Sequence, residues 1–258
     1  MFKEIIKDNN INKKDFTTLK KVNNKCAKAI KDYKLIKEND RILIGISGGK
    51  DSLILLENLA IMCNKAPFKY ELFAVHINVN NVPYEIDKEY INSLCNKYKI
   101  PFIYRSIDVD FNNKNFKKKK KSNCFVCSWN RRTELFKISQ EFNCNKLALG
   151  HHMDDVVETL LMNMSFQGSI STMPPTLKMF DGKLEIIRPM CLVPECEMIN
   201  YLTIRKFKLL NKDCPYEEES NRKKVKDLVA KFEELYPYAR NNFYKSMSNI
   251  MEEYLPAK

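Results

Sequence analysis

Residues 41–52 read Arg-Ile-Leu-Ile-Gly-Ile-Ser-Gly-Gly-Lys-Asp-Ser, and this stretch decides the fold. The apolar run at residues 41–46 is typical of a buried strand. The apolar periodic stretch Leu53–Met62, after the two glycines, predicts a helix. A strand, a glycine turn and a helix in this order form the first unit of an α/β fold.

The same alternation continues along the chain. Further strands are predicted at residues 70–78, 101–109, 146–150 and 184–188, and the helices between them at residues 86–98, 129–142 and 154–166. This rhythm predicts an α/β fold with a doubly wound parallel sheet, in which right-handed crossovers bring the carboxyl ends of the strands to one edge.

Helical extensions are predicted on both sides of the sheet, at residues 16–37, 195–207, 222–235 and 238–254. We therefore expect three parts. They are an N-terminal helical lead (1–40), a nucleotide-binding α/β domain (41–190) and a C-terminal helical segment (191–258).

The composition suits a globular chain with a polyanionic partner. The chain has 258 residues, 44% of them apolar, and a formal net charge of +12. The charge favours nucleic acid as a partner, although lysine is abundant throughout the chain and can raise the charge without a binding role. No apolar run approaches the roughly 20 residues of a membrane span, and the N-terminus is too polar for a secretory signal. We expect a cytoplasmic protein with no membrane partner.

The glycine loop, Ser47–Ser52, has the features of a phosphate site. Gly48 and Gly49 allow the backbone to approach a ligand, and the following helix begins with free N–H groups and a positive dipole end. Ser47 and Ser52 can add hydroxyl donors, and Lys50 can add charge. The loop is not a Walker loop, because Asp51 stands where that motif has Ser or Thr. Asp51 beside phosphate indicates Mg²⁺; the alternative is a polar turn without a ligand.

A second polar cluster follows the strand predicted at residues 146–150 and reads Gly150-His-His-Met-Asp-Asp155. Asp154 and Asp155 can hold Mg²⁺, and the imidazoles can donate hydrogen bonds or act as bases. Alternatively, the same residues cap and pack a helix. We place Gly150, His151 and His76, from the strand at residues 70–78, among the nucleotide-binding residues.

The nine cysteines divide by context. Cys124-Phe-Val-Cys127 is predicted in a loop before a helix, where the pair can bind metal or act in redox chemistry, and Cys214, followed by proline, is the partner that we nominate. Three thiolates suit a [4Fe–4S] cluster with one open iron, whereas a structural zinc would need a fourth ligand from Cys191 or Cys196. Burial is expected for Cys26, Cys63, Cys95 and Cys144.

The glycine loop resembles the pyrophosphate-binding loop of the ATP-pyrophosphatase (PP-loop) superfamily. The ordered motifs together resemble the tRNA 2-thiocytidine synthetase (TtcA-like) family over about residues 16–216. They are the glycine loop, Cys124–Cys127, Gly150–Thr159, Gly168-Ser169, Met173-Pro-Pro175, Ile187-Arg-Pro189 and Cys214. The resemblance implies an enzyme that uses ATP, Mg²⁺ and a [4Fe–4S] cluster to thiolate an anticodon-loop cytidine. It assigns ATP binding to Ser47, Gly48, Gly49, Asp51 and Ser52, and cluster ligation to Cys124, Cys127 and Cys214. It also implies a possible homodimer, because relatives are often dimers.

The expected chemistry is adenylation of a pyrimidine C2 oxygen followed by its replacement with sulfur. Lys50 and Asp51, with Asp154 or Asp155, are the expected catalytic residues. The partners are tRNA and a sulfur donor such as a cysteine desulfurase. Lys117–Lys121 with Arg131-Arg132 can contact tRNA phosphates or form a solvated surface. The chain departs from the family pattern after Cys214. The alternatives are a 2-thiouridine-forming thiolase, an adenylating tRNA ligase, or a zinc-stabilised RNA-binding protein.

Overall fold

The computed structural model describes residues 11–82, 85–113, 116, 122–210 and 221–255. The chain divides into two compact units. The first consists of Met1–His152 and Pro175–Glu217, and the second of Met153–Pro174 and Glu218–Lys258. The boundaries predicted after residues 40 and 190 both fall inside the first unit, and they stay a prediction about domains.

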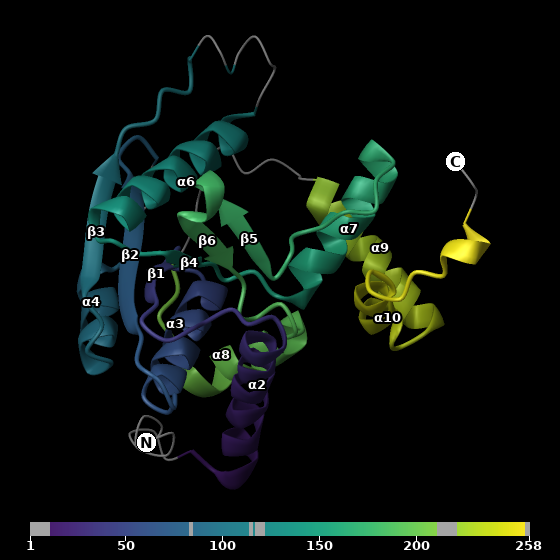
Figure 1. The fold of residues 1–258 in the computed structure, drawn as a ribbon, viewed down its shortest axis with the longest axis horizontal. Coiled ribbons are helices and arrows are strands. Elements are labelled where there is room, and N and C mark those ends of the chain that lie inside the picture. Colours follow the sequence, from purple (N-terminus) through teal and green to yellow (C-terminus); the bar gives the residue numbers. More distant parts are fainter. Residues whose placement is uncertain (1–10, 83–84, 114–115, 117–121, 211–220, 256–258) are drawn as a thin grey trace. The chain divides into compact units, whose positions relative to one another are not determined.

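The first unit is built on a six-stranded sheet with the order β3-β2-β1-β4-β6-β5 (Figure 1). The strands are β1 (Arg41–Gly45), β2 (Glu71–Val79), β3 (Phe102–Ile107), β4 (Lys146–Ala148), β5 (Thr176–Met179) and β6 (Leu184–Ile187). Pairing is parallel from β3 to β6, which confirms the predicted α/β sheet. The edge strand β5 runs antiparallel to β6 and was not predicted, because it is short and half exposed and so lacks an apolar run.

The helices of the first unit are α2 (Lys13–Asp32), α3 (Lys50–Cys63), α4 (Lys88–Lys97), α6 (Asn123–Glu141) and α8 (Glu195–Arg205). Helices α2 and α8 pack against α3 and against each other. Helix α3 contacts β1 and β2, α4 contacts β3, and α6 contacts β2 and β4. Leu43 of β1 and Leu147 of β4 share an apolar cluster with Ile138 of α6. Because side chains alternate along a strand, Ile42 and Ile44 face the opposite side of the sheet.

Two helices begin earlier than predicted. Helix α3 starts at Lys50 and not at Leu53, so the second half of the glycine loop is its first turn. Helix α6 starts at Asn123, so Cys124 and Cys127 lie in a helix and not in the predicted loop. The reason is local: Ser122 is the N-cap of α6, and its hydroxyl accepts a hydrogen bond from the backbone N–H of Phe125.

A buried carboxylate ties three helices of the first unit together. Glu57 of α3 is fully buried and accepts hydrogen bonds from the guanidinium of Arg205 at the end of α8. The hydroxyls of Tyr98, at the end of α4, and Tyr201, on α8, donate to the same carboxylate. Burial raises the pKa of both tyrosines, so the phenols remain protonated donors. The position of α3 therefore depends on α4 and α8.

The second unit consists of short helices: α7 (Met153–Gln167), α9 (Asn221–Leu235), α10 (Ala239–Ser246) and the 3₁₀ turn η3 (Glu252–Tyr254). Its apolar cluster contains Met153, Val157 and Val229. The single helix predicted at residues 238–254 is wrong, because α10 ends at Ser246 and the N–H of Ser248 turns back to the carbonyl of Lys245. In the described part of the chain, no helix is long and apolar enough to cross a membrane.

Candidate functional site

The glycine loop lies at the point where the strand order of the sheet reverses. From β1 the chain passes through α3 to β2 on one side, and it later returns to β4 on the other side of β1. The glycine loop follows β1, and Gly150-His151-His152 follows β4. In sheets of this kind, ligands bind outside the carboxyl ends of the two strands that flank the reversal. The topology therefore brings both predicted motifs to one ligand-binding edge.

The conformation of the glycine loop excludes a side chain at its centre. Gly48 has φ +80°, and a Cβ built there would lie 2.8 Å from Cγ2 of Ile86 and 2.9 Å from Cβ of Leu210. The carbonyl of Gly48 also accepts a hydrogen bond of 2.9 Å from the N–H of Leu210. The Ser52 hydroxyl closes the loop, accepting from the N–H of Ser47 at 3.1 Å and donating to the carbonyl of Gly49 at 2.9 Å.

The start of α3 fits a phosphate group. Gly49 is the N-cap of α3 and supplies no side-chain hydrogen bond to the first turn. The N–H groups and the positive end of the helix dipole therefore face the loop. Gly150 lies against the same turn, since a Cβ on it would come within 3.1 Å of the backbone of Asp51 and Ser52. The two motifs thus meet at Gly150, and this close approach, here called the cradle, leaves no room for a side chain at that glycine.

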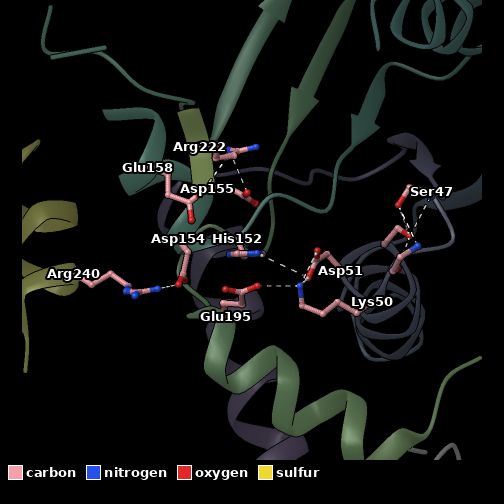
Figure 2. A network of polar contacts seen from close by, with 12 residues as sticks. Ser47, Lys50, Asp51, His152, Asp154, Asp155, Glu158, Glu195, Arg222 and Arg240 are labelled. Carbon is pink, nitrogen blue, oxygen red and sulfur yellow. Dashed lines mark hydrogen bonds and ion pairs between the residues drawn. The ribbon is translucent and has the colours of Figure 1, made fainter. Parts of the chain in front are cut away.

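Lys50 lies between two carboxylates beside this cradle (Figure 2). Its Nζ is 3.3 Å from Oδ1 of Asp51 and 3.1 Å from Oε1 of Glu195, the first residue of α8. Burial opposes the charge, but the two carboxylates outweigh it and raise the pKa of Lys50. His152, which is buried, places its Nε2 3.9 Å from Oδ1 of Asp51. Sequence reasoning missed Glu195, which lies 145 residues from Lys50.

The two other predicted histidines have backbone and side-chain partners in the first unit. His76 is buried in β2, and its Nδ1–H donates to the carbonyl of Ile46 at 2.8 Å, directly before the glycine loop. His151 accepts a hydrogen bond of 3.3 Å from Nε of Arg188. Burial and the nearby charge of Arg132 lower the pKa of Arg188. Contact of His76 or His151 with a nucleotide stays a prediction, and the structure supports a role of His76 in holding the loop.

In the second unit, arginines pair with the predicted acidic residues (Figure 2). Arg240 forms an ion pair with Asp154, and Arg222 contacts Asp155 at 3.3 Å and Glu158 at 2.8 Å. Burial raises the pKa of Glu158 and outweighs the opposing effect of Arg222. The arginines could not be identified from the sequence, because they follow the acids by more than sixty residues. The magnesium role of Asp154 and Asp155 stays a prediction.

The cysteine turn, Ser122–Cys127, is the first turn of α6. Cys124 is exposed, and Cys127 is half-buried beside the apolar cluster of Val79, Val109 and Val126. Residues three apart share one face of a helix, and the helix N-terminus favours thiolates. The two thiols therefore fit a shared metal or cluster.

Part of this predicted site cannot be compared with the structure. Cys214 and Lys117–Lys121 lie outside the described residues. Within the described residues, no three Cys, His, Asp or Glu side chains form a group able to hold a metal ion.

The remaining described cysteines are mostly buried, as predicted. Cys26, Cys95 and Cys144 lie in the core, and Cys63 is half-buried. Burial raises the pKa of Cys95 to about 12 and that of Cys144 to about 11, which keeps both thiols protonated and unreactive. The two residues considered as zinc ligands differ, since Cys191 is fully buried and Cys196 is exposed on α8.

Comparison with known proteins agrees with this geometry. A family model described as the PP-loop domain matches residues 18–232. A tRNA-cytidine(32) 2-sulfurtransferase of Geotalea uraniireducens is 34% identical over 91% of this chain and 93% of its own. The enzyme of the same name from Janthinobacterium sp. is 34% identical over 89% of this chain and 72% of its own.

A solved structure also resembles the chain. It is the U34-tRNA thiolase NcsA from Methanococcus maripaludis with its [4Fe-4S] cluster. It matches with a TM-score of 0.69 and 25% identity, over 93% of this chain and 80% of its own.

Proposed function

The chain belongs to the PP-loop domain family, and we propose that it is an ATP-dependent tRNA sulfurtransferase acting on an anticodon-loop cytidine. The relatives named tRNA-cytidine(32) 2-sulfurtransferase, which match nine tenths of the chain, support this substrate. The observation that carries the proposal is the contact of the glycine loop with Gly150 at the reversal point of the sheet. This contact supports a phosphate site beside the cationic Lys50, and the same chain carries the cysteine turn at the start of α6.

The first half of the proposed reaction activates the base. The C2 oxygen of cytosine attacks the α-phosphorus of ATP, the bond from that phosphorus to pyrophosphate breaks, and pyrophosphate leaves with the electron pair. The N–H groups at the start of α3 and the ammonium of Lys50 hold the phosphates, and their charges offset the charge that develops on the leaving group. Asp51, with Asp154 or Asp155, is proposed to hold the Mg²⁺ that accompanies ATP.

The second half replaces the activated oxygen. A sulfur nucleophile attacks C2, the C2–O bond breaks, and AMP leaves with the original oxygen. A [4Fe–4S] cluster held by Cys124, Cys127 and Cys214 would carry the sulfur for this step. The helical spacing of Cys124 and Cys127 supports these two as ligands, and the similar thiolase with its [4Fe-4S] cluster supports the choice of cluster. The base must be unstacked for the attack, so an unpaired loop nucleotide is the expected target.

A second candidate is thiolation of a uridine. The similar solved structure is a U34-tRNA thiolase, and the same adenylation and displacement apply to a uracil oxygen.

The test of the proposed function is anaerobic reconstitution of the purified chain with iron and sulfide, followed by incubation with ATP and tRNA and mass spectrometry of the nucleosides. We expect 2-thiocytidine at position 32, with AMP formed in step with the product. A tRNA that retains uridine 34 but has cytidine 32 replaced distinguishes the two candidates.

The remaining alternatives give different products in the same experiment. AMP formation with no sulfur in the tRNA would identify an adenylating ligase. One tightly bound zinc, with neither iron uptake nor tRNA-dependent AMP release, would identify a zinc-stabilised RNA-binding protein. We further propose a cysteine desulfurase as the sulfur donor and a homodimer as the assembly. Sulfur transfer from labelled cysteine and sedimentation velocity test these two proposals.

A further inference from the structure

Helix α6 carries an exposed aromatic pair directly beside the cysteine turn. Phe125 and Trp129 are four residues apart and so share one face of the helix. Their rings stack with centroids 6.2 Å apart and an angle of 20° between the planes. The side chains are 38% and 50% exposed, although Val126 on the same turn is almost fully buried. Phe125 also meets the ring of Phe116 edge-on, with centroids 6.2 Å apart, and Phe116 packs on the buried cluster that contains Val126. Trp129 is therefore the more open ring of the pair.

Positive charge continues the same face of the helix. Arg132 follows Trp129 by three residues and Phe125 by seven, which places all three side chains on one stripe. Arg132 is exposed, and its position on the stripe brings a positive charge beside the two rings. A face of two stacked rings followed by a cation matches the chemistry of an unpaired nucleotide, whose base stacks and whose phosphate is negative.

We propose that the stripe of Phe125, Trp129 and Arg132 binds an unpaired nucleotide of the tRNA loop. The base stacks on the aromatic pair, and the neighbouring phosphate contacts Arg132. This inference rests on the proposed function for its substrate, and it adds a specific binding surface. Because Phe125 lies between Cys124 and Cys127 in the sequence, a base held there stays within one turn of α6 from the thiols.

The first test uses the single tryptophan of the sequence as its probe. In the reconstituted full-length protein without RNA, acrylamide should quench Trp129 readily, and its emission should be that of a solvated indole. An anticodon stem-loop RNA should quench the fluorescence, whereas a blunt duplex of the same stem should not. A protected indole in the RNA-free protein, or equal quenching by both RNAs, would contradict the proposal.

The second test separates stacking from charge. Binding of a fluorescein-labelled stem-loop is followed by anisotropy at several salt concentrations. Trp129→Ala should weaken binding by about 5-fold to 150-fold without changing the salt dependence. Trp129→Phe should stay within about threefold of the original, since it keeps a ring. Arg132→Gln should reduce the slope of log affinity against log salt by about 0.7. The matched control is Tyr254→Ala, which removes a 79% exposed ring elsewhere and should leave binding unchanged.

The outcomes distinguish this inference from the proposed function. If Trp129→Ala shows normal thiolation and unchanged affinity for the stem-loop, the binding stripe is rejected and the proposed sulfurtransferase activity stands. If the stem-loop quenches Trp129 but no ATP-dependent thiolation occurs, the binding stripe stands and the proposed sulfurtransferase activity is rejected. Failure of the original protein to bind the stem-loop would reject both. If a protein partner and not RNA quenches Trp129, the stripe is a protein-docking surface and the inference is wrong.

Discussion

The glycine loop and the cysteine turn both occupy the N-terminal turn of a helix, but they differ in what the chain supplies. The phosphate site proposed for the loop combines backbone N–H groups with the side chains of Lys50 and Asp51, and the central Gly48 has no room for a side chain. The turn offers two thiols, one exposed and one half-buried, on a regular helix capped by Ser122. One added carbon atom at Gly48 should therefore disrupt the loop, whereas disrupting the proposed metal site of the turn requires removal of a thiol.

The largest expected effect is on the cysteine turn. Cys124→Ser should lower tRNA thiolation by at least about 1000-fold, or ~4 kcal/mol in the barrier, because it removes a proposed cluster ligand. Pyrophosphate release from ATP in the presence of tRNA, which reports the first half-reaction, should remain, since the glycine loop is untouched. Cys196→Ser, which changes another exposed cysteine, is the matched control and should keep both activities. Equal loss of both half-reactions in Cys124→Ser would mean that the two regions do not act separately.

The next effect concerns the support of the glycine loop. Arg205→Ala leaves the buried carboxylate of Glu57 without its cation, and the free energy of unfolding should fall by about 3–5 kcal/mol. Tyr98→Phe removes one neutral donor from the same charged carboxylate and should cost about 1.5–3 kcal/mol, less than the loss of the cation. Urea denaturation measures both. Similar losses in the two variants would show that the charge of Arg205 is not what holds α3 and α8 together.

Alanine substitutions of glycines measure how strongly the loop rejects a side chain. Gly48→Ala combines a positive φ with the clash against Ile86 and Leu210, and we expect a loss of about 2–4 kcal/mol in stability with weaker ATP binding. Gly182 is the control for strain alone: its φ is +85° and no atom lies within 4 Å of an added Cβ. Gly182→Ala should cost about 1–2 kcal/mol. Denaturation measures the stability of both variants, and calorimetric titration measures their ATP binding. Equal losses in Gly48→Ala and Gly182→Ala would contradict a role of the clash at Gly48.

The smallest expected effect is a shift with pH. Asp51 and Glu195 raise the pKa of Lys50 against the effect of burial, so Lys50 keeps its charge to a higher pH than an isolated lysine at that depth. Glu195→Gln removes one of these carboxylates and lowers that pKa. The alkaline limb of the pH profile for ATP use should therefore move to lower pH, with a change in KM below about tenfold. Asp87→Asn, which breaks the exposed pair with Lys208, should leave the profile in place.

Local patterns predicted much of the fold and the place of the glycine loop in it. The apolar run at residues 41–46 and the glycines after it are sufficient to place β1 and the glycine loop, because strand and turn propensities act over a few residues. The pairing of Lys50 with Glu195 and the contacts of Glu57 with Arg205 could not be predicted. They join residues more than one hundred positions apart and depend on how α8 packs. The capping serine of α6 was available in the sequence, and it would have placed Cys124 in a helix.

The buried Glu57–Arg205 pair has a consequence for the behaviour of the protein on heating. The hydration of charged groups becomes less favourable as temperature rises, so the free energy lost by keeping this pair away from water decreases. Solvent-exposed pairs such as Asp87–Lys208 lose less hydration on folding, so their stability increases less from this effect as the temperature rises. The link between α3 and α8 therefore weakens less with temperature than the surface contacts do.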